Sequence, residues 1–75
     1  MSKLPRIPSV VVTRALKSAG FFEYHRTGSH AQFRNLNKPE LRITIPFSKK
    51  DLAPKTLKSI IKQAGLTVEE FINLL

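Results

Sequence analysis

A two-residue turn at Gly28-Ser29 restricts the fold of this chain more than any other feature. Glycine at the first central position suits a type II′ turn, which joins two antiparallel strands in a fixed register. That register should pair residues across the hairpin and put six of them on one face: Thr27 with His30, His25 with Gln32, and Glu23 with Arg34. The opposite face then carries Phe22, Tyr24, Ala31 and Phe33, which we expect to point into the core.

A third strand is expected from about Leu41 to Ile45, after the Asn37-Lys38-Pro39 turn. Two registers against the second strand are conceivable, and they differ by one residue. One of them keeps apolar residues together, whereas the slipped register sets Ile43 opposite Arg34. The favoured register pairs Phe33 with Ile43, Ala31 with Ile45, Arg34 with Arg42 and Gln32 with Thr44. The sheet should therefore have one apolar face and one polar, basic face that contains His30.

Apolar residues at helical spacing predict a first helix from about Val10 to Ala19, with Ser9 as its cap and Gly20 as its stop. A second helix should start at Pro54 and end at Gly65.

The run from Thr67 to Glu70 matches a capping box and predicts a short last helix. The element order is α-β-β-β-α-α. We therefore expect an α+β fold, in which a three-stranded antiparallel sheet carries its helices on one face.

The composition suits one small domain over residues 1–75, with a surface site rather than a deep cofactor pocket. Thirteen Lys and Arg against five Asp and Glu give a formal charge of +8, which attracts polyanions. Nucleic acid is the leading partner class, although an anionic membrane or an acidic protein would also be attracted. The start of the chain lacks the apolar stretch of a signal peptide, no segment is apolar enough to span a bilayer, and there are no cysteines, so we expect a cytoplasmic protein.

His30 is the candidate for chemistry, because the expected register places its imidazole on the basic face beside Arg34 and Arg42. Histidine titrates near neutral pH and can serve as a general acid or base. Thr27, directly opposite, could orient the ring or contact phosphate. From spacing alone, a surface histidine at the end of a hairpin explains the position equally well.

Cleavage of RNA requires a proton taken from the ribose 2′-hydroxyl and a proton given to the leaving 5′-oxygen. His30 could fill one role, whereas His25 reads better as an ordinary surface residue. Arg34 and Arg42 are candidate phosphate clamps, with a solvated basic face as the other interpretation. The acidic residues are scattered, so we expect metal-independent chemistry and no cofactor.

The loop after the third strand supplies further candidates for RNA contact. Lys49 and Lys50 could hold backbone phosphates. Phe47 could stack on a base, although a plug at the edge of the core is the better reading.

The chain resembles the HicA family of toxins over almost its whole length. The resemblance is carried by the helix ending Ala19-Gly20-Phe21, the turn Arg26-Thr27-Gly28-Ser29-His30, the strand end Ile45-Pro46, and the run from Leu57 to Gly65 followed by Thr67-Val68-Glu69-Glu70-Phe71. It implies a double-stranded-RNA-binding-like fold, an mRNA-cleaving ribonuclease that halts translation, and inhibition by a HicB antitoxin. It also implies that the family's catalytic histidine is His30, with Gly28 and Ser29 as the structural turn. Many family members place another histidine shortly after the third strand, where this chain has Phe47 and Ser48.

Our first hypothesis is therefore a type II toxin, an mRNA-cleaving endoribonuclease that uses His30 and is neutralised by a HicB-type antitoxin. The alternative is a non-catalytic module that binds RNA by its shape, as double-stranded-RNA-binding domains do. A third view, compatible with the first, is a protein folded around an acidic antitoxin. The expected partners are mRNA and the antitoxin, with no membrane, and with DNA only indirectly through an antitoxin complex.

Overall fold

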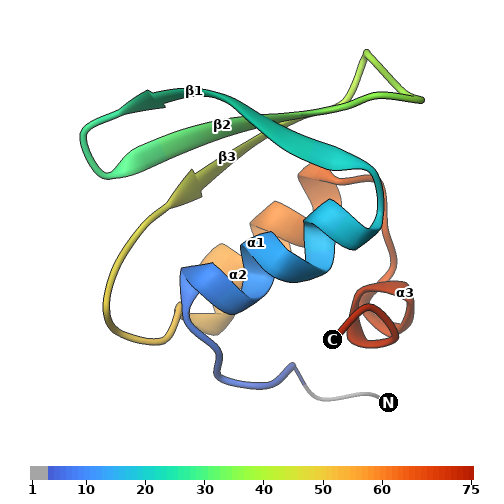
Figure 1. Ribbon diagram of the computed structural model, residues 1–75. Helices are drawn as coiled ribbons and strands as arrows, with labels where there is room; N and C mark the ends of the chain where they lie inside the picture. Colours follow the sequence, from blue (N-terminus) through green and yellow to red (C-terminus); the bar gives the residue numbers. More distant parts are fainter. Residues whose placement is uncertain (1–3) are drawn as a thin grey trace.

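A three-stranded antiparallel sheet in the order β1-β2-β3 is covered by helices on one face, as Figure 1 shows. The computed structural model describes residues 4–75. Our expectation that the chain starts without a signal peptide therefore concerns, in part, residues outside the described range. The expected α+β architecture is confirmed. Its elements are α1 (Ser9–Ser18), β1 (Phe21–Thr27), β2 (His30–Asn35), β3 (Arg42–Pro46), α2 (Pro54–Gln63) and α3 (Val68–Ile72).

The core lies between the sheet and the helices. Phe33 on β2 and Ile43 on β3 are opposite each other and almost fully buried. Every helix also contributes core side chains, among them Val12, Leu16, Leu57, Ile60 and Phe71. The expected β2–β3 register is confirmed at all four predicted pairs. Burying this apolar set is the main stabilising contribution, at about 25 cal/mol per Å² removed from water.

The ends of the helices follow the sequence signals, with one exception. Pro54 stands at the start of α2, and Gly20 takes a positive φ of 95° after α1. Thr67 and Glu70 form the predicted capping box of α3, in which the Thr67 backbone N–H donates to the Glu70 carboxylate and lowers its pKa.

Ser9 does not cap α1, so that prediction is wrong. Pro8 occupies the N-cap position, and Ser9 is the first residue of the helix. The Ser9 hydroxyl instead accepts from the Ser48 backbone N–H at 3.1 Å and lies 3.3 Å from the Ser48 carbonyl. Because Ser9 is 1% exposed, this contact ties the start of α1 to the loop after β3 inside the protein.

Within residues 4–75, no helix is both long enough and apolar enough to cross a membrane.

Replacing Ser9 by Ala should lower the free energy of unfolding by about 1 kcal/mol, because the Ser48 N–H loses its partner. For a domain of this size, that loss corresponds to a fall of about 4 to 8 °C in the melting temperature. Ser18→Ala is the matched control, since the exposed Ser18 hydroxyl bonds only the Arg14 carbonyl one turn earlier. Thermal unfolding followed by circular dichroism measures both variants, and an equal melting temperature for the two would contradict the prediction.

Candidate nucleic-acid interface

The hairpin turn fixes the position of His30. Gly28 has a φ of 57°, whereas the φ of Ser29 is not positive. A type I′ turn requires a positive φ at both central residues, so the predicted type II′ turn fits better. Thr27 pairs with His30 as expected, and on its other side His30 pairs with Pro46. The Phe47 N–H donates to the Ser29 carbonyl at 2.6 Å, which ties the turn to the end of β3. His30 itself is exposed at the end of the sheet.

A β-bulge at Tyr24 changes the expected faces of β1. Pairing is regular from Thr27 to His25, but Glu23 then lies opposite Phe33 and Phe22 opposite Arg34. The predicted Glu23–Arg34 pair is therefore wrong. The extra residue shifts the alternation by one, which is the known effect of a bulge.

The shift also reverses which β1 side chains are buried. Phe21 enters the core at 4% exposure, whereas Phe22 and Tyr24 are 38% and 45% exposed. Our expectation that Phe22 and Tyr24 point inward is therefore wrong. Glu23 lies on the same side as the core residue Phe33 and not with His30.

We call the sheet face opposite the helices the outer face. Strand pairing and side-chain contacts place on it nine side chains: Phe22, Tyr24, His25 and Thr27 from β1, His30, Gln32 and Arg34 from β2, and Arg42 and Thr44 from β3. His30, Thr27, Arg34 and Arg42 thus share one face, as the sequence predicts. None of the nine carries a carboxylate.

Arg34 is held in place by an aromatic ring. Its guanidinium carbon lies 5.0 Å from the centre of the Tyr24 ring, and the Tyr24 hydroxyl donates to Gln32 at 2.7 Å. The Arg34 Nε is buried and, among the described residues, has no hydrogen-bond partner. Arg42 lies directly opposite Arg34, so two positive charges face each other across β2 and β3.

Thr27 contacts a different histidine from the one we expected it to orient. Its hydroxyl lies 2.9 Å from the Nε2 atom of His25, two residues earlier on the same strand. Thr27 therefore positions His25, and within residues 4–75 no side chain is hydrogen-bonded to the His30 ring.

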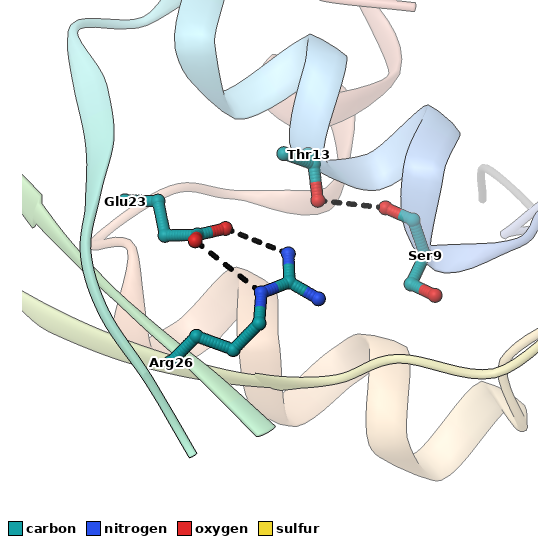
Figure 2. Close-up of polar contacts among 4 residues, drawn as sticks. All are labelled: Ser9, Thr13, Glu23 and Arg26. Atoms are coloured by element: carbon teal, nitrogen blue, oxygen red, sulfur yellow. Dashed lines mark hydrogen bonds and ion pairs between the residues drawn. The ribbon is translucent and has the colours of Figure 1, made fainter. Parts of the chain in front are cut away.

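An ion pair lies on the helix side of β1. The Arg26 guanidinium donates to the Glu23 carboxylate at 2.8 and 3.3 Å, and Figure 2 shows the two side chains pointing toward one another. This contact lowers the pKa of Glu23. The Arg26 guanidinium carbon also lies 4.2 Å from the centre of the Phe47 ring. Sequence analysis did not predict this ion pair, because the bulge decides the side on which Glu23 lies.

Phe47 packs against the core from the loop after β3, so the plug interpretation is the one observed. A surface pocket of about 300 Å³ lies beside it, lined by Ser9, Val10, Phe47, Ser48 and Lys49. Lys49 and Lys50 are both exposed in this loop. The pocket places Lys49 beside the start of α1, and Lys50 is followed by Asp51, which pairs with Pro8. The structure therefore places this part of the loop beside α1, away from the outer face.

Acidic and histidine side chains do not gather into a group of three that could hold a metal ion anywhere within residues 4–75. Metal-independent chemistry stays a prediction.

A family model described as the HicA toxin of bacterial toxin-antitoxin matches residues 12–66. The match runs from Val12, within α1, to Leu66, three residues after the end of α2, and includes the whole sheet. The chain belongs to the HicA toxin family. It is therefore a toxin of a toxin-antitoxin system. A comparison with curated proteins gives no significant match.

Replacing Gly28 by Ala in this HicA toxin should cost about 1 to 2 kcal/mol of stability, because an L side chain is strained at a φ of 57°. No atom lies within 4 Å of the added Cβ, so the cost comes from the backbone alone. A synthetic chain with D-alanine at this position is the matched control, since a D residue favours positive φ. Denaturant unfolding should show a loss for L-alanine and none for D-alanine, and equal losses would contradict a strained turn.

Proposed function

We propose that this HicA toxin is an endoribonuclease that cleaves mRNA and thereby inhibits translation, with His30 as general acid or base. One observation carries the proposal: His30 is an exposed imidazole at the turn of the β1–β2 hairpin, on a face with two arginines and no carboxylate. Membership of a toxin family supports a harmful activity, and the basic face supports an RNA substrate.

In this mechanism His30 either takes the proton of the ribose 2′-hydroxyl or gives a proton to the leaving 5′-oxygen. Phe47 stands where many family members have another histidine, and its ring offers neither a proton nor a lone pair. Arg26 lies over that ring. The second proton transfer is therefore assigned to solvent. We expect His30 to contribute more to the rate of RNA cleavage than the solvent does. No metal or cofactor takes part in the proposed reaction.

Arg34 and Arg42 are proposed to hold the phosphate backbone. Like charges directly opposite each other destabilise a sheet, and a phosphate between them would remove that repulsion. Guanidinium donors match phosphate oxygens, and positive charge stabilises the phosphorane-like transition state. Thr27 lies on the same face, and Lys49 and Lys50 extend the positive charge into the loop after β3. These five residues form the proposed RNA-binding set.

A HicB-type antitoxin is the proposed inhibitor. An acidic partner that covered the outer face would neutralise Arg34 and Arg42 and block His30 together. Contact with DNA is proposed only through such a complex. Since the substrate is mRNA, the proposed place of action is the cytoplasm.

A non-catalytic RNA-binding module is the second candidate, and one observation favours it. The Thr27 hydroxyl is bonded to His25, and no described side chain orients the His30 ring through a hydrogen bond. A general base is usually held by a second group. Binding by shape, as in double-stranded-RNA-binding domains, needs no such group.

His30→Ala should lower RNA cleavage by about 100-fold or more, the range typical of losing a general acid or base. It should also relieve the growth arrest that follows induced expression. His25→Ala is the matched control, because His25 lies on the same face and is expected to change cleavage by no more than about 3-fold. Cleavage of an mRNA with and without chelator is followed on gels.

Full cleavage by His30→Ala would contradict the assignment of His30. Intact RNA that the wild-type protein binds in a salt-sensitive way would favour the second candidate. Loss of cleavage on adding chelator would contradict metal-independent chemistry.

A further inference from the structure

Two large aromatic side chains are exposed on the outer face, on the edge strand β1. Tyr24 and Phe22 are 45% and 38% exposed, and the bulge brings both onto the side that carries Arg34. A face that served only to attract charge would need no exposed rings. Their presence indicates a ligand with both negative charge and flat apolar groups.

Tyr24 is already held in a fixed orientation. Arg34 covers one side of its ring, with 5.0 Å from the guanidinium carbon to the ring centre. The Tyr24 hydroxyl is fixed by Gln32 at 2.7 Å. Because Tyr24 is 45% exposed, part of its surface stays accessible beside Arg34. A ring held in this way loses little side-chain entropy when a second ring stacks on it.

The charge of the surroundings identifies the kind of ligand. Arg34 and Arg42 face each other without a carboxylate on the outer face, which favours a phosphate backbone. Bases of a duplex are stacked on each other and present no free face to a protein ring. Unpaired bases do, and aromatic rings and arginine planes are the groups on which they stack.

We propose that Tyr24, backed by Arg34 and flanked by Phe22, is a stacking platform for one unpaired base, so the RNA bound by the outer face is single-stranded. This inference rests on the proposed function in taking RNA as the ligand. Gln32, which fixes Tyr24, lies two residues from His30 on the same face, or about 7 Å along β2. The stacked base therefore belongs to a nucleotide close to the phosphate at His30.

The chain contains one tyrosine and no tryptophan, which makes the proposal directly measurable. Tyrosine fluorescence reports on Tyr24 alone, and a base stacked on the ring quenches it. The protein is prepared as His30→Ala so that RNA is not cut during the titration. The probes are a single-stranded oligoadenylate of about ten nucleotides, a duplex RNA of the same length, and inorganic polyphosphate.

Oligoadenylate should quench the fluorescence, whereas duplex RNA and polyphosphate should bind with little quenching. Tyr24→Ala, made in the same background, should weaken oligoadenylate binding by about 5- to 100-fold, the equivalent of losing one stacked base. The oligoadenylate affinity of Tyr24→Phe should stay within about 3-fold of that of its parent, because phenylalanine keeps the aromatic ring. Leu36→Ala removes an exposed apolar side chain outside the outer face and should change nothing. Affinities of the variants are measured by fluorescence anisotropy of labelled RNA.

Equal oligoadenylate affinity for Tyr24→Ala and its parent would overturn the proposal, as would equal quenching by duplex RNA. The proposal would also be overturned if Tyr24→Ala kept its RNA affinity but lost an acidic protein that copurifies with the parent. That outcome would assign the exposed rings to binding of the acidic protein. The two proposals fail separately. If oligoadenylate quenches the Tyr24 fluorescence of the wild-type protein but the protein cuts no RNA, the ribonuclease proposal is wrong and the stacking proposal stands. If the protein cuts RNA and Tyr24→Ala changes neither cleavage nor binding, the stacking proposal is wrong and the ribonuclease proposal stands.

Discussion

Strand β2 is the element on which both faces of the sheet depend, because it is hydrogen-bonded to β1 on one side and to β3 on the other. Its alternation sends Ala31 and Phe33 into the core with no exposed surface, and this burial leaves no freedom to slip by one residue. The same alternation forces His30, Gln32 and Arg34 to the outer face. Burial of apolar side chains on the helix side of the sheet thus decides which polar side chains lie on the outer face.

Features that depend on β2 were predictable from the sequence. The turn at Gly28, the β2–β3 register and the shared face of His30, Thr27, Arg34 and Arg42 all follow from turn chemistry and from keeping apolar residues together. Strand β1 was not predictable in the same way. Phe21 and Phe22 are adjacent, so either alternation supplies an apolar residue to the core, and the pattern contains no signal for the bulge at Tyr24.

The bulge accounts for the parts of the site that sequence reasoning missed. It turns Glu23 toward Arg26 on the helix side, which removes the one carboxylate expected beside His30. It also brings Tyr24 over Arg34. A single inserted residue therefore makes the outer face more positive and more aromatic at once. The prediction for Ser9 failed for a different reason, because its partner Ser48 is 39 residues away and no local pattern reports such a contact.

That distance has a consequence for the order in which the site is built. The hairpin closes between neighbouring residues, so it can form early, whereas the bonds from Ser29 to Phe47 and from Ser9 to Ser48 must wait for longer loops to close. A growing chain that has not yet reached residue 48 can display His30 on its turn but lacks the segment that braces the turn from β3. The assembled face thus depends on residues as far along the chain as Ser48, which delays the appearance of the site until that segment has been synthesised.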